Sequence, residues 1–468
     1  MVEGQWWLPY SPERRVPGTL TFDDDGLELV LYEALGEFVL PESGVAHMGA
    51  PEWKVEPVLH GRSRARKDFT LFEAGGANLA GPFFESREVY RPTLALEGSH
   101  TKEDRFTSIW CSFDYLGAWV DVPTVTTHEP DLVKIAFRAQ ELTNARLSDA
   151  SVRLMTGVNG TAGGARVELT QWTALAITPD EPSSAKALID RFSRPVQDLL
   201  MLSLGRPVRL TSVHLQPADQ EDPREGTAQA FFAAVQPSVA RKAPRDAALA
   251  IESYTAPTIL SSRRTTMPLD AILTRWFELW PRHRGVLELL LSPLYAPFMY
   301  GEHGFASTFQ SAEALHDLVG LHASDLSKAE HRRRVKAVAT ALEVAELSDD
   351  VREWVGRLIG GRNDTPLARR IEALVRSTGP VGEAVLAADE HFGRTVASAR
   401  AGVSHGSAKK KTKHKELDPV GRYWYGQVLR WVVRTRILME LLDDSDAAQR
   451  LVTERTPFQV AVDRIGST

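Results

Sequence analysis

The sequence predicts an α+β fold class, with a β-rich N-terminal domain at residues 1–265 and an all-α domain at residues 266–468. Up to about residue 215, short apolar runs alternate with turn residues, and beyond about residue 266 apolar residues recur at helical spacing. The length of 468 residues suits two or three domains. An apolar share of 43% with 25% charged residues indicates globular domains with sizeable cores.

Alternating apolar and polar residues predict strands in the N-terminal part. Residues 19–31, TLTFDDDGLELVL, alternate on both sides of an Asp/Gly turn, as in a hairpin. Residues 106–122, FTSIWCSFDYLGAWVDV, are aromatic and β-branched with one glycine break. Residues 154–177 offer two turn candidates, Asn159–Gly160 and a later Gly-Gly pair. These patterns predict antiparallel sheet structure.

One helix is predicted inside this β-rich part, at residues 183–204. Serine stands at its start as a candidate cap, apolar residues follow at spacings of three and four, and Gly205 is its candidate stop. Pro195 is expected to kink or split it, because proline lacks the amide hydrogen that a helix interior uses.

Helical periodicity or good helix formers occupy seven stretches of the C-terminal part, separated by Gly, Pro, Ser or Asp breaks. These stretches are residues 269–295, 305–322, 330–347, 350–361, 366–377, 380–405 and 420–444. They predict an all-α domain of about 200 residues.

Several classes of protein are excluded or disfavoured. Cys111 is the only cysteine, which excludes an intrachain disulfide framework, and its aromatic strand context predicts a core position. The chain has no basic start followed by an apolar segment and no apolar run of about 18 residues, so we expect a cytoplasmic protein without a membrane partner. His303, His316 and His322 are spaced poorly for zinc, and we expect no metal and no cofactor.

Positive charge is concentrated in one region of an acidic chain. The net charge is −6, yet residues 394–436 hold eleven Lys or Arg and two acids. Five of the lysines, Lys409, Lys410, Lys411, Lys413 and Lys415, lie within seven positions. Such a block predicts one local anionic partner, and a solvated loop is the alternative.

Arginine is followed by histidine at the fifth position twice, about as often as 42 arginines and 13 histidines give by chance. Arg209 and His214 lie in a strand-like segment, where they would face opposite sides about 16 Å apart. Arg400 and His405 instead lie at the end of a predicted helix. There they flank the buried stripe that begins at Phe392, because helical residues advance about 100° each.

Two interpretations of the Arg400 and His405 pair stay open on these residues alone. Gly402 and Gly406 weaken the helix and could let His405 turn back toward Arg400 as part of a catalytic site. The alternative is a packed helix end with a capping imidazole.

The last long helix of this region is predicted to have a basic edge as well as a buried stripe. The stripe consists of Trp424, Val428, Trp431, Leu438 and Leu442. The basic edge consists of arginines at multiples of four, Arg422, Arg430 and Arg434. It predicts a surface for RNA phosphates, and pairing with nearby acids such as Asp443 is the alternative.

The motif RAGVSHG resembles that of the HEPN superfamily, whose ribonucleases carry arginine, four to six spacers and histidine at a helix end before another long helix. The N-terminal segment WLPYSPERRVPGTLTF resembles the N-terminal domain of ApeA-type anti-phage HEPN proteins. The resemblance covers most of the chain, including FQSAEALH, where Glu313 matches a recurrent acid that is either structural or part of the site. Ala401 departs from the polar residue that many active members place after the arginine.

The resemblance implies an α-helical HEPN bundle that acts as a metal-independent endoribonuclease in abortive infection. Its target is host RNA, with tRNA as one candidate. The 2′-OH attacks at a composite site of a homodimer or higher homo-oligomer, with His405 transferring protons and Arg400 holding the phosphate. The N-terminal domain is then a sensor that a phage-encoded trigger releases. A catalytically silent HEPN protein that binds nucleic acid or a nucleotide as a scaffold is the alternative.

Overall fold

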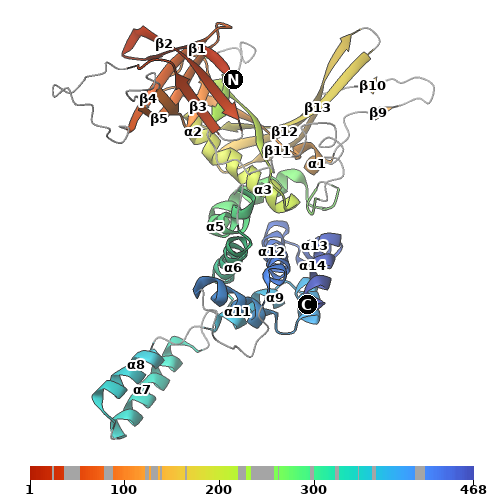
Figure 1. Ribbon diagram of the computed structural model, residues 1–468. Coiled ribbons are helices and arrows are strands. Elements are labelled where there is room, and N and C mark those ends of the chain that lie inside the picture. The colour runs from red at the N-terminus through yellow and green to blue at the C-terminus, as the bar shows by residue number, and fades with distance from the viewer. Residues whose placement is uncertain are drawn as a thin grey trace, which may run out of the picture. The chain divides into compact units, whose positions relative to one another are not determined.

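The computed structural model divides into two compact units, Met1–Phe277 and Glu278–Thr468 (Figure 1). It describes the chain except residues 24–25, 36–52, 79–87, 122–125, 128–134, 137–139, 164–165, 220–227, 233–257, 262, 296–299, 322–325, 346, 361–364, 406–416 and 468. The predicted α+β fold class is confirmed, with strands in the first unit and helices in the second. The division falls inside helix α5 (Leu269–Tyr295), beyond the predicted boundary at residues 265 and 266.

The first unit contains a thirteen-stranded sheet in the order β11-β12-β13-β8-β14-β15-β7-β5-β4-β1-β2-β3-β6, and a separate pair β9 and β10. The strands are β1 (Val2–Leu8), β2 (Ser11–Asp23), β3 (Gly26–Leu31), β4 (Trp53–Ser63), β5 (Asp68–Asn78), β6 (Glu88–Arg91), β7 (Leu94–Glu97), β8 (Phe106–Phe113), β9 (Thr126–Thr127), β10 (Ile135–Ala136), β11 (Gln140–Arg146), β12 (Ala150–Gly163), β13 (Arg166–Pro179), β14 (Leu210–Pro217) and β15 (Ala228–Phe232).

Six of these strands form a closed ring, because β6 pairs with both β3 and β5. Trp6, Leu20, Leu29 and Leu71 are fully buried in its core. Only glycine fits at position 61 of β4, because a Cβ there would lie 2.1 Å from the Trp6 ring. Ring closure gives each of the six strands two neighbours, which removes open edges.

The predicted helix at 183–204 is confirmed, with a break before its proline. Ser184 caps α2 (Ala185–Leu188) by accepting from the Ala187 amide. A π-helical turn, η1 (Ile189–Ser193), then leads into α3 (Arg194–Leu204), with Pro195 in its first turn. The wider turn lies immediately before Pro195, whose missing amide hydrogen interrupts the regular hydrogen bonding of an α-helix. Gly205 ends α3 at φ 70°.

Two strand predictions need correction in detail, whereas the hairpin of β2 and β3 is confirmed. Of the segment 106–122, the described residues 106–121 form one strand, β8, which is followed by the short helix α1 (Leu116–Val120). β12 and β13 pair through Asn159, opposite Thr170, so the chain reverses between Gly163 and Arg166. Of the two turn candidates, Asn159–Gly160 therefore lies within the paired strands and is not the turn.

Helices form the second unit. They are the later part of α5, α6 (Gly301–Leu318), α7 (Lys328–Val344), α8 (Asp349–Gly360), α9 (Leu367–Arg376), α10 (Pro380–Ala388), α11 (Phe392–His405), α12 (Pro419–Leu442), α13 (Ser445–Thr453) and α14 (Thr456–Gly466). The stretch predicted as one helix at 380–405 is two, because the chain leaves helical geometry at Asp389. Among the described residues, no helix is both long and apolar enough to cross a membrane.

Helix α12 lies at the centre of this unit and packs against α6, α13 and α14. Its predicted stripe is buried at Val428, Trp431, Leu438 and Leu442, while Trp424 is half-buried. Burial of one continuous face of a long helix is the main source of its stability, because propensity alone contributes little.

Candidate functional site

Helix α11 carries both Arg400 and His405, and the partly buried carboxylate of Asp389 fixes its beginning. Asp389 Oδ1 accepts from the His391 amide at 2.8 Å, which caps the helix start. Asp389 Oδ2 accepts from Thr395 Oγ1 at 3.0 Å and from the Tyr425 hydroxyl of α12 at 2.8 Å. Burial, followed by this bond to Asp389, raises the pKa of Tyr425. The carboxylate thus fastens α11 to the central helix.

Apolar packing fixes the same end of α11. Phe392 and Val396 are fully buried, four residues apart on one face. The Phe392 ring stacks on that of Tyr425, with centroids 5.5 Å apart and planes at 14°. A Cβ at Gly393 would lie 2.4 Å from the Ala368 carbonyl oxygen, so this glycine permits close contact between α11 and α9.

Arg400 lies where α11 meets α6. Its Nη2 atom is 4.0 Å from Glu313 Oε2, and its guanidinium carbon is 5.8 Å from the centre of the Phe309 ring. The Arg400 side chain is 33% exposed. It makes no hydrogen bond with any residue that the structure describes. Its N–H donors therefore remain available to an anion while the carboxylate and the ring limit its orientation.

Arg370 of α9 lies on the other side of Glu313 and is engaged differently. Its Nη1 atom is 3.9 Å from Glu313 Oε1, and its Nη2 atom donates to Asp317 Oδ1. Burial alone would raise the pKa of Asp317, but hydrogen bonds involving His316 and Arg370 outweigh it and lower this pKa. Arg370 is thus committed to protein carboxylates, whereas Arg400 is not.

His316, whose spacing from His322 fits zinc poorly, is completely buried beside this pair. Its Nδ1 atom is 3.1 Å from Asp317 Oδ1 and 3.5 Å from Arg370 Nε. The contact between His316 and Arg370 links α6 to α9. In the described part of the chain, no group of three or more His, Cys, Asp or Glu side chains is placed to hold a metal ion.

His405 is the last residue of α11, and its side chain lies outside the described residues. Five positions along a helix correspond to a rise of about 7.5 Å and a rotation of about 140°. The convergence of His405 on Arg400 therefore stays a prediction. All five lysines of the predicted basic loop, Lys409, Lys410, Lys411, Lys413 and Lys415, lie in the segment 406–416 that the structure does not describe.

The three arginines of α12 do not form the exposed basic edge that their spacing predicts. Arg422 Nη2 lies 3.2 Å from Glu302 Oε1 of α6. Arg434 is buried, with its guanidinium carbon 4.5 Å from the Trp431 ring centre. Burial first, and then the neighbouring charges of Arg430 and Arg455, lower the pKa of Arg434 to about 9. Each step of four residues advances a helix by about 400°, so Arg422 and Arg434 are rotated about 120° apart.

Arg370 is the member of this cluster that sequence reasoning missed. It lies in an amphipathic helix with two other arginines, Arg369 and Arg376, and nothing in its spacing distinguishes it from them. Its partner Glu313 is 57 positions earlier in the chain. A motif search limited to one helix therefore finds no signal for the pair.

Two family models match the chain. The model described as ApeA N-terminal domain 1 matches residues 1–255, and the model described as Apea-like HEPN matches residues 307–445. Comparison with curated proteins and with solved structures gave no match. The second model spans Glu313, Arg370, Arg400 and His405, which are the residues around which the site is built. The chain belongs to the ApeA-type family of HEPN proteins.

Proposed function

We propose that this HEPN-family anti-phage protein is an endoribonuclease that cleaves host RNA without a metal ion. The observation that carries the proposal is Arg400. Its guanidinium is oriented by Glu313 and Phe309, is one-third exposed, and lies on the same helix as His405. An arginine with uncommitted donors is suited to bind a phosphate through two oxygens.

RNA supplies its own nucleophile, so the protein needs only proton transfer and charge stabilisation. A base removes the proton of the ribose 2′-OH, that oxygen attacks phosphorus, and the bond to the 5′ oxygen breaks as an acid supplies its proton. An ordinary imidazole has a pKa of about 6.5, which suits proton transfer near neutral pH. We assign proton transfer to His405 and stabilisation of the phosphate charge to Arg400.

One histidine cannot serve as base and acid in the same step. We infer that two chains contribute one Arg400 and His405 pair each to a shared cleft in a homodimer or higher homo-oligomer. The lysine run between residues 409 and 415 would then hold the RNA backbone through charge. The N-terminal domain, 1–265 in the predicted division, would act as a sensor that restrains cleavage until a phage-encoded trigger binds.

The deciding experiment incubates purified full-length protein with end-labelled total RNA or tRNA in excess EDTA. Because the chemistry needs no metal, wild-type protein should cleave RNA and leave 2′,3′-cyclic phosphate and 5′-hydroxyl ends. His405→Ala should abolish cleavage without changing the circular dichroism spectrum. Arg376→Ala is the matched control, since Arg376 is exposed on α9 and pairs with Glu372. RNA binding without cleavage would favour the silent scaffold, and inhibition by EDTA would exclude metal independence.

A mixing experiment tests the composite site separately. Arg400→Ala protein added to wild type should reduce activity more than dilution does, because mixed dimers contain one defective half. Activity that falls in simple proportion to the wild-type fraction would show that each chain works alone.

A further inference from the structure

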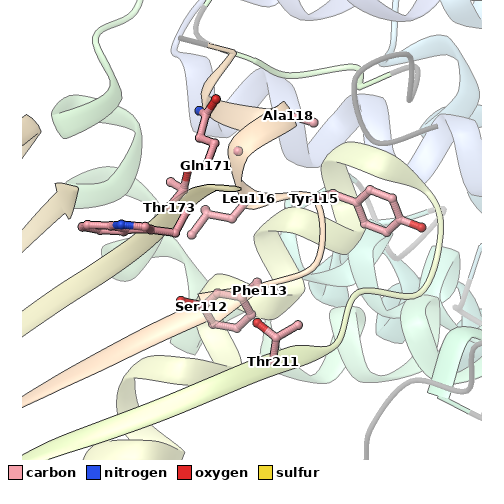
Figure 2. A pocket seen from close by; sticks show the side chains of 10 residues that line it. Ser112, Phe113, Tyr115, Leu116, Ala118, Gln171, Thr173 and Thr211 are labelled. Carbon is pink, nitrogen blue, oxygen red and sulfur yellow. The ribbon is translucent and has the colours of Figure 1, made fainter. Parts of the chain in front are cut away.

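A pocket of about 290 Å³ lies in the first unit, where strands β8 and β13 separate. Its lining comes from the end of β8, helix α1, β13 and the start of β14. Figure 2 shows Gln171 and Thr173 on one side and Ser112 and Phe113 on the other. The volume is at the lower limit for a drug-sized ligand and leaves room for a large side chain.

The pocket lies beside a stretch of β13 that, among the described residues, pairs with a strand on one side only. Among the described residues, β13 pairs with β8 only from Leu175 to Ile177. Its pairing with β12 on the other side continues as far as Arg166. Within that description, the stretch from Arg166 to Ala174 therefore has a neighbouring strand on one side only. Unpaired strand edges of this length favour addition of another strand.

One side-chain hydrogen bond shows which backbone groups point into this open side. Thr156 Oγ1 of β12 donates to the Trp172 carbonyl at 2.9 Å, so that carbonyl points toward β12. Successive residues of an antiparallel strand direct their N–H and C=O groups to alternate sides. The backbone groups of Gln171 and Thr173 therefore point away from β12, toward the open edge and the pocket.

The lining is polar but uncharged. It combines hydroxyl groups, one carboxamide and aromatic rings, and its residues are Ser112, Phe113, Tyr115, Leu116, Gly117, Ala118, Gln171, Trp172, Thr173 and Thr211. None of these lining residues is charged, and the neighbouring Arg209 Nε donates to Asp114 Oδ2 at 2.9 Å. A charged group entering this pocket would lose water without a charged lining residue to pair with, so the lining favours a neutral side chain.

The backbone beside the pocket is held in an uncommon conformation. Tyr115 has φ 62° and Asp121 has φ 52°, so left-handed residues flank α1 at both ends. The Arg206 guanidinium lies 5.5 Å from the centre of the Tyr115 ring and limits its movement. Left-handed non-glycine residues cost energy and are concentrated at binding sites, where the surroundings hold them in place.

We propose that this edge binds an extended segment of another protein, which adds to β13 as a strand and places a neutral side chain in the pocket. The open backbone groups match a peptide strand, which a small molecule would leave unused. The uncharged lining selects a neutral, preferably aromatic or amide-bearing residue at the end of the strand. The proposal concerns binding to the first unit and does not depend on the nuclease assignment.

The test uses full-length protein and a displayed library of random peptides of about ten residues, the length of a long strand. Selection on the wild type, with counter-selection on Gln171→Pro, should enrich peptides with a neutral residue at a constant position. Proline removes the outward amide of residue 171, whereas Gln171→Ala keeps it. The enriched peptide should bind Gln171→Pro at least about tenfold more weakly and Gln171→Ala about as well as wild type.

Two further measurements make the outcome decisive. Ala118→Trp, which fills the pocket without touching β13 pairing, should also weaken binding at least about tenfold. Hydrogen exchange of residues 166–173 should slow when the peptide binds, because strand addition protects those amides. Equal binding to wild type and Gln171→Pro, failure to enrich any peptide, or protection confined to other segments would each overturn the proposal.

Discussion

Glu313→Gln should separate the positioning of Arg400 from its chemistry. The substitution keeps the shape of the side chain but removes the negative charge that lies 4.0 Å from Arg400 and 3.9 Å from Arg370. Two unit charges at 4 Å interact by about 4 kcal/mol at an effective dielectric constant near 20. The Arg400 and Glu313 side chains are 33% and 21% exposed and share no hydrogen bond. Solvent screening therefore reduces the contribution to about 1 kcal/mol.

That magnitude predicts a modest and specific kinetic effect. Loss of about 1 kcal/mol of the interaction that orients Arg400 should raise the activation free energy by about the same amount and lower kcat about fivefold. RNA binding should strengthen or stay unchanged, because the site becomes more positive. Arg400→Ala should instead cost about 10²–10³ in rate, as expected for removal of a group that stabilises transition-state charge. Single-turnover cleavage of a fluorescent RNA in EDTA, over a range of protein concentrations, separates the rate from the affinity.

A double-mutant cycle and a surface control complete this test. If Glu313 acts through Arg400, the double variant should be no slower than Arg400→Ala alone. Glu372→Gln, which removes an exposed partner of Arg376, should leave the rate unchanged. Additive losses in the double variant, or full kcat in Glu313→Gln, would show that Glu313 does not position Arg400.

The remaining predictions concern stability and RNA binding. Tyr425→Phe should lower the free energy of unfolding of the helical unit by about 2 kcal/mol, since it removes a 2.8 Å hydrogen bond to the Asp389 carboxylate; an unchanged urea midpoint would contradict this. The His283 side chain, whose Nε2 atom lies 3.2 Å from Glu440 Oε2, lowers the pKa of Glu440 despite burial, so this stabilisation is present above the unfolded pKa of about 4.3 and is lost as pH falls through the lower folded value. Acid titration of the unfolding midpoint should show a loss that Glu440→Gln lacks. Changing the first three lysines of the 409–415 run to alanine should flatten the salt dependence of RNA binding by about 0.7 in log–log slope for each lost contact, and an equal slope would mark them as solvent-facing residues.

Periodicity predicts a helix such as α12 well because that helix buries one continuous face. The limits of periodicity are visible at α12. Arg422 and Arg434 are separated by a multiple of four positions, yet they lie on different sides of the helix. The sequence shows the drift of about 40° at each step, yet it does not show which neighbouring helix covers the far side. The burial of Arg434 depends on that neighbouring helix, and therefore it could be determined only from the structure.

Short elements and distant partners are the other features that the sequence leaves open. Helix α1 has only five residues, too few for a helical period to emerge from an aromatic strand-like segment. Arg370 and Glu313 meet because α6 and α9 pack together, not because of any local spacing. Arg400 was recognisable because its motif lies on one helix, whereas its supporting residues come from two others.

The charges around Arg400 suggest how affinity and chemistry are divided in the proposed nuclease. Arg400 and Arg370 bring two positive charges, and Glu313 and Asp317 bring two negative ones, so the cluster is neutral overall. A neutral cluster attracts a polyanion only weakly, even though Arg400 has donors to offer a phosphate. RNA must then be drawn in by charge from elsewhere, and the lysine run that follows His405 is the largest concentration of it in the chain. Loss of those lysines should therefore reduce RNA binding and leave the rate at saturating RNA unchanged. Loss of Arg400 should instead lower that rate and leave RNA binding largely unchanged.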